Sequence, residues 1–474
     1  MHYRTRLNTG VCLMAVILTG CATVGPDFTS PSALAPSRYQ AVESTGGFVF
    51  AGESAGPPWW TSFGAADLDT LVATALKGSP TIAEAEAALD SARAAAAVVE
   101  GASSPQVGLS SGVERARING AAFGFDGFPN RTISRYTVGS TVSYDLDLFG
   151  GNRRALESAS AKVQVQGYQL DAARLAIAGN TTRTAILIAA LRAQITTAEA
   201  VVADDRQTLA LAQRSVDAGA SGRIDLLRVQ TQLAQDLAVL PALRRDLASA
   251  QNALAALTGS APGDWTDRTF SLEDFTVPSS RPLAIPSLLL RGRPDILAAE
   301  SAYHAAIAQI GVDRARLYPN LNITAQFAQT ALSPDGLFGP AGAGWNLASG
   351  LTAPLWNGGS LRARVRQAEA EARRAEARYR ATVLKAFVEV ADGLEAVSAS
   401  ETELRLRQTA LTTAEENLRL ARRAYELGSL RLLDVLDAQR QANGARQAFG
   451  RAQGERLLAY ADLFAATATV AASS

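Results

Sequence analysis

Histidine, methionine and cysteine are nearly absent from this chain of 474 residues, which holds only two of each. Four of these six residues stand near its start: Met1, His2, Cys12 and Met14. If the mature chain begins at Cys21, as argued below, it keeps no methionine and only one histidine, His304. This scarcity argues strongly against histidine or methionine metal clusters, zinc sites and histidine-based triads, and it leaves no disulfide within one subunit. We therefore expect His304 to be a packing or surface residue.

A charge block is also missing. The chain carries 45 basic and 45 acidic residues, so nothing marks it as a nucleic-acid binder. Aromatic residues make up only 6%, which suits rods packed through small side chains better than a large aromatic core. We find no phosphate loop, no metal-ligand spacing and no nucleophile with a histidine partner, so an enzyme is the function class least expected.

The N-terminus has the pattern of a targeting segment. Arg4 and Arg6 precede an apolar run, Val11 to Leu18, that is too short to span a membrane permanently. The run ends in Leu18-Thr19-Gly20-Cys21, which resembles a bacterial lipoprotein box. We therefore predict a signal peptide over 1–20 and a lipidated Cys21, with a diacylglycerol and an N-acyl chain as the only attached groups and no other cofactor. The alternative is an ordinary secretory signal that happens to contain a cysteine.

The longest uninterrupted stretch of helix-favouring residues runs from Asn152 to Asp217 without a proline. At the rise of an α-helix it would reach roughly 100 Å, far more than a compact domain needs. Glycine in Ala218-Gly219-Ala220-Ser221-Gly222 can take a left-handed cap, and Ser221 can cap a returning helix. The pattern predicts a hairpin of two long helices.

The returning helix has a heptad repeat, which predicts a coiled-coil seam. Its members are Leu226, Leu233, Leu240, Leu247 and Leu254. Asp236 interrupts the companion register of apolar residues, and Pro241 removes a backbone hydrogen bond, so we expect a kink there.

The same design occurs twice. Leu361 to Tyr425 is a second proline-free helix with a heptad repeat, and Gly428-Ser429 marks its tip. Landmarks of the two copies, such as Gly219 and Gly428, align at an offset of about 210 residues. The chain is therefore predicted to be two tandem copies of one unit.

Between the helices of each copy, the apolar residues alternate with polar ones. This period of two predicts strands with one apolar face at about 105–116 and 134–148, and again at about 319–331 and 343–355. Glycine- and proline-rich loops, 118–134 and 333–344, join them. Each copy therefore follows the order helix, strand, loop, strand, long helix, tip, helix.

These observations divide the chain into segments. After the signal peptide we expect a lipidated tether over 21–60, a first repeat over 61–258, a connector over 259–286 and a second repeat over 287–474. Within the first repeat, Asp67 to Leu76 is predicted to form only one or two amphipathic turns, and a helix starts at Pro80 and reaches about Gly101.

Strands of this length and pattern suit a transmembrane β-barrel or a half-buried sheet in a soluble domain. Four strands cannot close a barrel, and open edges are not tolerated in lipid, so a barrel requires several subunits. Because each strand pair continues into long helices, a barrel of strands would continue into a barrel of helices. The polar strand face would then line a water-filled lumen.

Several short motifs occur in order along this repeat. After the lipoprotein box come Gly25-Pro26-Asp27-Phe28, Trp59-Trp60, Asp145-Leu146-Asp147-Leu148-Phe149-Gly150, Arg291-Gly292-Arg293-Pro294-Asp295-Ile296, Pro354-Leu355-Trp356-Asn357-Gly358-Gly359 and Leu433-Asp434-Val435-Leu436-Asp437-Ala438-Gln439-Arg440. Together they resemble the TolC-like outer membrane factors, specifically the OprM/NodT-type lipoprotein branch, over essentially the whole mature chain.

The resemblance implies a mainly α fold with a membrane β-barrel: long coiled-coil hairpins in two tandem repeats, and four strands per subunit that complete a twelve-stranded barrel in a homotrimer. It implies an outer-membrane exit duct of a tripartite efflux system in a Gram-negative bacterium. Partners would be a periplasmic adaptor, an inner-membrane transporter of the resistance-nodulation-division type, and outer-membrane lipid. No chemistry is expected of such a duct.

The resemblance also assigns candidate residues at the tips of the helices. Asp434 and Asp437, with Tyr425 one turn before the tip, match the periplasmic gate, where three copies of each aspartate would concentrate negative potential. Asp434 could equally cap a helix. The tips themselves are expected to contact the adaptor; their residues include Gly219, Ser221, Gly428, Ser429 and Leu430. Leu430 stands where some members have an arginine, and Arg431 follows it.

Three alternatives remain. A duct for type I protein secretion would share the fold, although the lipoprotein box favours efflux. A periplasmic adaptor should show one hairpin flanked by β-rich modules, whereas this chain predicts two hairpins. A non-channel periplasmic coiled-coil lipoprotein would explain the heptads and leave the alternating strands without a role.

Overall fold

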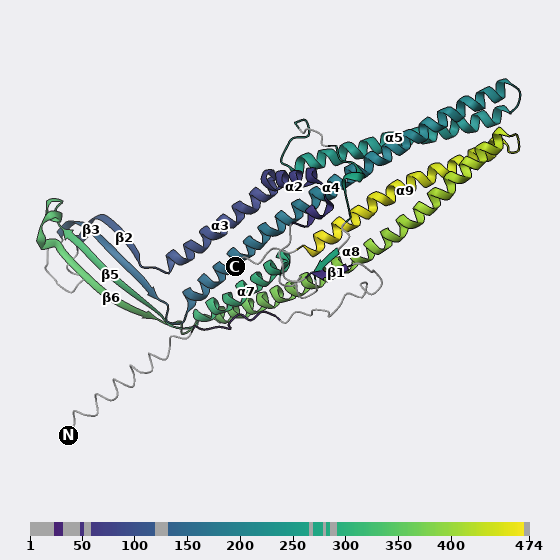
Figure 1. The fold of residues 1–474 in the computed structure, drawn as a ribbon. Helices are drawn as coiled ribbons and strands as arrows, with labels where there is room; N and C mark the ends of the chain where they lie inside the picture. The colour runs from purple at the N-terminus through teal and green to yellow at the C-terminus, as the bar shows by residue number, and fades with distance from the viewer. Residues whose placement is uncertain are drawn as a thin grey trace. The chain divides into compact units, whose positions relative to one another are not determined.

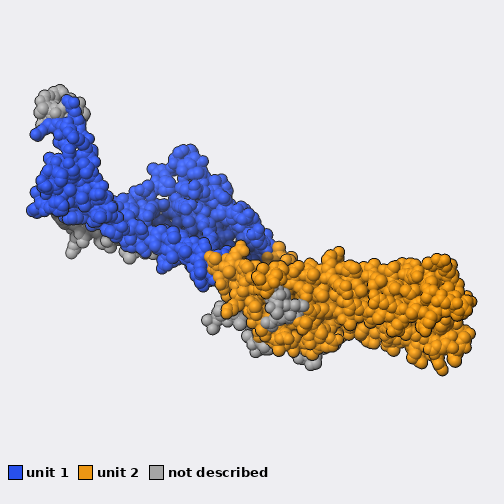
Figure 2. Space-filling view, turned by 90° about the horizontal axis from the view of Figure 1, so that it is seen from above, with its two compact units in different colours: residues 1–31, 88–167, 298–379 blue, residues 32–87, 168–297, 380–474 orange. Residues whose placement is uncertain are grey.

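The structure is a computed structural model that describes residues 23–31, 48–51, 58–118, 131–264, 269–277, 281–284 and 292–468. Over these ranges the chain is mainly helical, with one four-stranded and one two-stranded sheet (Figure 1). The signal peptide, Cys21, most of the tether and most of the loop over 118–134 lie outside the described residues. The chain divides into two compact units (Figure 2): residues 1–31, 88–167 and 298–379, and residues 32–87, 168–297 and 380–474.

The first unit contains the four-stranded antiparallel sheet, in the order β2-β3-β5-β6. Its strands are β2 (Gln106–Ile118), β3 (Arg131–Leu146), β5 (Asn320–Ala331) and β6 (Ala343–Thr352). All four were predicted, but β2 and β3 extend further into the loop between them. Pairing of Ile118 with Arg131 continues the ladder beyond the alternating residues. The loop over 333–344 forms two short 3-10 helices, η5 (Asp335–Phe338) and η6 (Pro340–Gly342).

Four long helices continue from these strands or lead into them. They are α3 (Pro80–Ala102), α4 (Gly151–Asp217), α7 (Pro294–Ala315) and α8 (Ser360–Glu426). The two 67-residue helices, α4 and α8, confirm the two proline-free stretches. Among the described helices, α4 alone is long and apolar enough to cross a bilayer, but half of its apolar stretch is buried within the chain. Packing in the core accounts for that composition.

In the second unit each long helix turns back into a shorter one, α5 (Arg223–Leu257) or α9 (Leu432–Thr467). The α5 heptad lies on the packed side: Leu226, Leu240 and Leu254 are buried. Leu240 contacts a cluster that includes Ala198 and Val202 of α4, as expected for a coiled-coil seam. Helix α5 continues through Pro241 without a break; the expected kink remains a prediction.

The main core of the second unit lies where the hairpins meet the short N-terminal elements. Tyr460, Phe63 and Leu254 are among its fully buried side chains. Helix α2 (Ala66–Gly78) contributes Leu68, Leu71, Val72 and Ala75. The prediction of one or two turns there was too short, because the helix has thirteen residues, with buried positions from Leu68 to Ala75.

Two short strands and a 3-10 helix were missed. Strand β1 (Phe48–Ala51), within the expected tether, pairs in parallel with β4 (Arg281–Ala284), within the expected connector. The connector also contains a 3-10 helix, η4 (Leu272–Asp274). Each strand has only four residues and its partner is more than two hundred residues away, so no local pattern marks it.

Candidate functional site: the strand faces and the helix tips

One face of the four-stranded sheet is apolar and exposed. The register places Val107, Leu109 and Val113 of β2 on the same face as Tyr136, Val138 and Val142 of β3, Leu321, Ile323 and Phe327 of β5, and Trp345, Leu347 and Leu351 of β6. Leu109 is 82% exposed and Trp345 is 81% exposed. A continuous apolar sheet face of this size, not covered by the chain itself, is what a lipid-facing surface requires.

The opposite face is polar. Glu114 and Arg135 form a cross-strand ion pair, and Asp145 accepts a hydrogen bond of 2.7 Å from Asn322. Thr137, Thr141, Gln326 and Asn346 lie on the same face by register. Polar cross-strand pairs on one face and exposed apolar residues on the other match a strand wall between lipid and water.

The two edge strands of the sheet show that it needs further strands to form a closed barrel. Within the described chain, β2 and β6 each pair on one side only. Lipid offers no hydrogen bonds to the free edges, so each edge has to pair with a strand of another subunit. The sheet therefore defines one sector of a membrane pore built from several chains.

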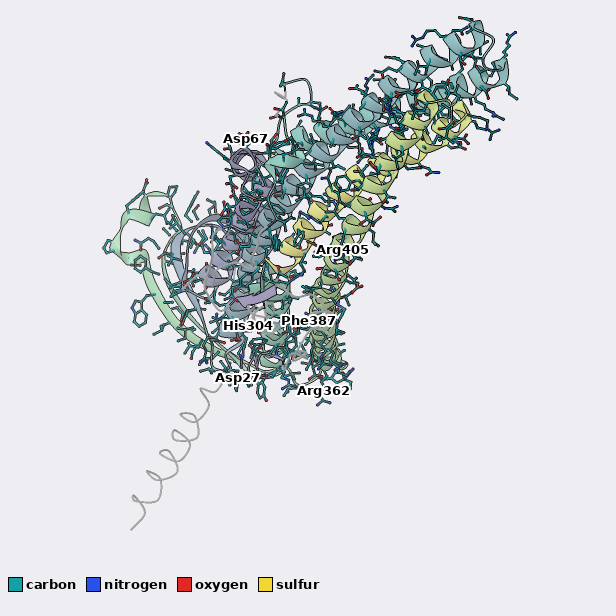
Figure 3. All side chains as sticks on the ribbon, turned by 45° about the vertical axis from the view of Figure 1, so that its right-hand side comes forward. Asp27, Asp67, His304, Arg362, Phe387 and Arg405 are labelled. Atoms are coloured by element: carbon teal, nitrogen blue, oxygen red, sulfur yellow. The ribbon has the colours of Figure 1, made fainter. Side chains whose placement is uncertain are left out.

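The N-terminal segment is fixed to the helices next to this sheet (Figure 3 labels Asp27 and His304). Asp27 binds Arg154 at 2.5 Å, and Glu157 accepts from Arg154 at 2.7 Å and contacts Nε2 of His304 at 2.9 Å. Phe28 stacks on the His304 ring with centroids 4.3 Å apart. Burial alone would raise the pKa of Glu157, but hydrogen bonds and charge from Arg154 and His304 lower it below its usual range. His304 is thus a packing residue, as expected.

Glycines make this attachment close. A Cβ on Gly25 would lie 2.6 Å from Cα of Gly311, and one on Gly150 would lie 2.3 Å from Cγ2 of Thr23. Gly25 and Gly150 also have positive φ angles, which favour glycine. The attachment therefore holds Thr23 at the junction of β3 and α4.

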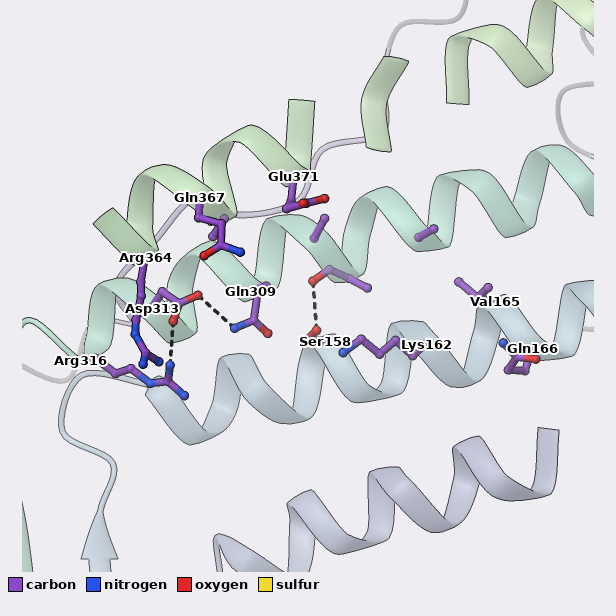
Figure 4. A pocket seen from close by; sticks show the side chains of 14 residues that line it. Ser158, Lys162, Val165, Gln166, Gln309, Asp313, Arg316, Arg364, Gln367 and Glu371 are labelled. Atoms are coloured by element: carbon purple, nitrogen blue, oxygen red, sulfur yellow. Dashed lines mark hydrogen bonds and ion pairs between the residues drawn. The ribbon is translucent and has the colours of Figure 1, made fainter. Parts of the chain in front are cut away.

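A groove of about 680 Å³ lies in the first unit between α4, α7 and α8 (Figure 4). Its charged lining residues are Lys162, Asp313, Arg316, Arg364 and Glu371. Asp313 accepts hydrogen bonds from Arg316 at 2.8 Å and Gln309 at 3.2 Å. The groove therefore presents a mixed-charge surface on which the acidic Asp313 already has partners within the same unit.

The two tips of the second unit have the same backbone design. Gly219 and Gly428 have φ angles of 71° and 73°. The amide of Gly219 donates to the carbonyl of Val216 and that of Ala220 to Ser215; Gly428 and Ser429 donate to Tyr425 and Ala424 in the same way. These are Schellman caps, which end a helix through a left-handed glycine. The expected reversals at both tips are confirmed.

The prediction of one capping residue was wrong. Ser221 does not cap α5: the N-cap is Gly222, no side chain completes the cap, and the buried Ser221 hydroxyl has no partner in the described chain. The Schellman turn uses Ala220 as its last residue, which places Ser221 one position too early. Ser429 Oγ instead donates back to the carbonyl of Ala424 at 2.9 Å. Leu430 is partly exposed at the second tip.

The candidate gate residues lie together at the second tip. Asp434 accepts from the backbone amide of Arg431 at 3.0 Å, and its carboxylate is 3.7 Å from Nε of that arginine. Asp437 pairs with Arg440 one turn further along. Tyr425 is half-buried and contacts clusters of both hairpins. Asp434 therefore does cap α9, and each aspartate also has an arginine beside it in the same subunit.

A polar cluster inside the second unit was missed. Asp205 and Thr208 of α4 meet Gln439 of α9, and all three side chains are buried. Asp236 of α5, which interrupts the heptad register, also lies there. The break that Asp236 makes in the heptad pattern is the one sequence feature that points to this cluster. The residues that Asp236 meets could not be predicted, because they lie on other helices.

Comparison with known proteins agrees with this geometry. The outer membrane efflux protein family matches residues 71–260 and 285–469. The pyoverdine export outer membrane protein OpmQ of Pseudomonas putida is 29% identical over 86% of this chain and 87% of its own length. Nodulation protein T of Rhizobium leguminosarum bv. viciae is 29% identical over 93% and 89%. The solved outer-membrane channel OprN superposes with a TM-score of 0.88 at 25% identity, covering 94% of this chain and 98% of its own.

This chain belongs to the outer membrane efflux protein family. It is an outer-membrane channel, and its four strands are one subunit's share of a twelve-stranded barrel in a trimer. Such channels are the outer-membrane ducts of tripartite efflux systems and work with a periplasmic adaptor and an inner-membrane pump. Members of this family are channels and not enzymes. The predicted family, fold class and localisation are confirmed.

Proposed function

We propose that this channel is a lipid-anchored exit duct whose periplasmic end is closed by the second tip. The observation that carries the gate is the placement of Asp434 and Asp437 on the first turns of α9, one turn apart and at the same tip as Tyr425. In a trimer, each aspartate would occur three times around the axis, and a ring of carboxylates favours cations.

The arginines beside these aspartates refine the gate. Arg431 and Arg440 lie close enough to offset part of the negative potential. Arg431 also stands next to Leu430, where some members have an arginine, so it is placed to supply the positive charge of the tip. A tip that combines both charges can form ion pairs between subunits when closed.

Single-channel recording tests the gate. Replacing both residues, Asp434→Ala and Asp437→Ala, should raise conductance and lower cation selectivity, because the constriction loses its bulk and its charge. The matched control is Asp225→Ala, at the corresponding position of the first tip, which should leave both properties unchanged. Unchanged conductance and selectivity in the double variant would rule out these residues as the constriction.

The lipid anchor is proposed from the lipoprotein box and supported by the attachment at Thr23 to Phe28. Attachment beside the sheet keeps acyl chains on Cys21 within reach of the membrane that surrounds the barrel. Intact-mass measurement of the mature protein should show a chain that starts at Cys21 and carries the diacylglycerol and N-acyl groups. An unmodified N-terminus at another residue would contradict the anchor.

The partners are proposed to meet the channel at its two tips. Gly219, Ser221, Gly428, Ser429 and Leu430 lie in the two helix reversals, and an adaptor would contact these reversals to couple the channel to a proton-driven pump of the resistance-nodulation-division type. Crosslinking from Leu430→Cys should capture the adaptor in membranes that contain the pump, with Val98→Cys on α3 as an exposed control. Equal capture from both positions would argue against the tips.

A further inference from the structure

Three helices of the second unit meet at the buried polar cluster. Thr208 Oγ1 donates to Oε1 of Gln439 at 2.9 Å, and Nε2 of Gln439 donates to Oδ1 of Asp205 at 3.0 Å. Asp205 and Thr208 belong to the first hairpin and Gln439 belongs to the second. The cluster therefore joins the two hairpins of one subunit through side chains that are each at most 7% exposed.

The carboxylate of Asp205 is only half satisfied. Its Oδ1 has the amide of Gln439, but its buried Oδ2 has no hydrogen-bond donor in the described chain. The carboxyl of Asp236, on α5, lies within hydrogen-bonding reach of Asp205 and accepts from Gln232 at 2.8 Å. Two ionised carboxylates cannot hydrogen-bond to each other, so the pair is satisfied only when it shares a proton.

Charged groups around the pair come from every helix packed against it. Asp204 precedes Asp205 on α4 and contacts Arg446 of α9 at 3.3 Å and Arg422 of α8 at 3.8 Å. Arg446 also pairs with Glu415 of α8 at 2.9 Å. These arginines are therefore already engaged with other carboxylates.

Two further arginines line the side of the cluster that opens into a groove. Arg228 of α5 pairs with Asp225 at 3.6 Å, and Arg440 of α9 pairs with Asp437. Neither makes an ion pair with Asp205 among the described residues. A proton is thus the remaining way to neutralise the Asp205–Asp236 pair.

Burial, the hydrogen bond and the charge of Asp236 raise the pKa of Asp205 from 3.8 to about 7, while Gln439 opposes the rise. The groove beside the cluster, of about 490 Å³, gives water a route to Asp205. It is lined from α4, α5 and α9, so protons can exchange without the helices separating.

We propose that Asp205 and Asp236, together with Gln439, form a proton-dependent latch that holds α4 against α5 and α9. When the pair shares a proton, the cluster is satisfied and the three helices pack. When the proton leaves, two negative charges face each other in a buried site, and packing weakens. The latch concerns contacts inside one subunit and does not depend on Asp434 and Asp437 forming the gate.

The direction of the pH effect follows from the pKa shift. The three packed helices bind the proton more tightly than separated, solvated helices, in which Asp205 would return to a pKa near 3.8. Packing therefore loses stability as pH rises from about 4 towards about 7, and above that range both states have lost the proton and the loss is complete. The latch holds at acidic pH and loosens at neutral to alkaline pH.

Hydrogen–deuterium exchange of the intact trimer tests the latch. Exchange in peptides that cover 203–210 of α4 and 435–443 of α9, corrected for the intrinsic pH dependence of amide exchange, should rise by about tenfold between about pH 5.5 and about pH 8. Asp205→Asn keeps the shape of the side chain without its charge, so it should abolish the rise. Asp246→Asn, at an exposed carboxylate of α5, should retain the wild-type rise.

Two results would overturn the latch: wild-type exchange that does not change with pH in these peptides, or a wild-type rise that persists in Asp205→Asn. If Asp205→Asn does not assemble, Asp236→Asn decides, because removal of that carboxyl should return the pKa of Asp205 towards its usual range and reduce the rise. An unchanged rise in Asp236→Asn would contradict the proposal.

Discussion

The first and second helix tips share a backbone but differ in chemistry. Both end on a left-handed glycine with the same pair of Schellman hydrogen bonds. The returning helices then diverge: the N-cap of α5 is Gly222 and has no side-chain partner, whereas the backbone amide of Arg431, the N-cap of α9, donates to the carboxylate of Asp434. Repetition thus preserves the turn, while the charges differ between the copies.

The charges of the two tips suggest a different role for each copy of the repeat. Aligned on their glycines, Arg228 of the first tip corresponds to Asp437 of the second, so the charge at that position is reversed. Only the second tip carries two aspartates on the first turns of its returning helix. Backbone geometry explains the helix reversal in both copies, and the proposed acidic gate needs only the second.

The largest expected effect comes from the packing that both copies share. Leu226 and Val435 occupy corresponding buried positions. Leu226→Ala should lower the local free energy of opening by about 3 kcal/mol, and Val435→Ala by about 2 kcal/mol, since fewer carbon atoms leave the core. Hydrogen exchange of the tip helices measures both, with the 51% exposed Leu227→Ala as the control. A Leu227→Ala effect as large as that of Leu226→Ala would show that the packed face is assigned incorrectly.

A smaller loss of stability, equal in the two copies, is expected from substitution of the two glycines that cap α4 and α8. Gly219→Ala and Gly428→Ala each force a positive φ on a residue with a Cβ and should cost about 1 to 2 kcal/mol, since no neighbouring atom adds a clash. Gly222→Ala, with φ of −85°, forces no positive φ and should cost less than either. Exchange of the last turns of α4 and α8 measures the cost. Unequal costs at the two glycines would contradict the shared turn.

The smallest expected effect is a difference in stability between substitutions of Asp434 and Asp225, which occupy corresponding positions in the two copies. Asp434→Ala removes the acceptor of the Arg431 amide and should cost about 1 kcal/mol, whereas Asp225→Ala should cost about 0.5 kcal/mol, because Asp225 contributes only its charge near the helix N-terminus and an ion pair with Arg228. Exchange of the first turns of α9 and α5 compares them. If Asp225→Ala proved the costlier change, the asymmetry between the tips would be contradicted.

Much of the fold could be predicted because its signals are local. Sixty-seven residues without a proline indicate a long helix, and alternation along β3 and β5 indicates strands wherever their partners lie. The pore followed from open strand edges and the helices that continue from them. Strands β1 and β4 escaped because four residues carry no periodicity and their pairing spans the whole first repeat.

The site was predictable only where it lies on one element. Gly219 and Gly428 show a turn by themselves, and Asp434 stands at a helix start. Ser221 was assigned incorrectly because a shift of one residue decides which side chain reaches the cap. Asp236 was visible as a polar break in the seam, but Asp205 and Gln439 come from other helices, and only packing brings them together.

The measurement that tests the central claim most directly is planar-bilayer conductance of the purified protein, with the oligomeric mass determined on the same sample. The exposed apolar strand face and unpaired sheet edges predict a trimer that inserts into the bilayer. The proposed ring of Asp434 and Asp437 predicts that its currents are small and cation-selective. A monomer that gives no current under any condition would contradict the assignment of these strands to a multi-chain pore.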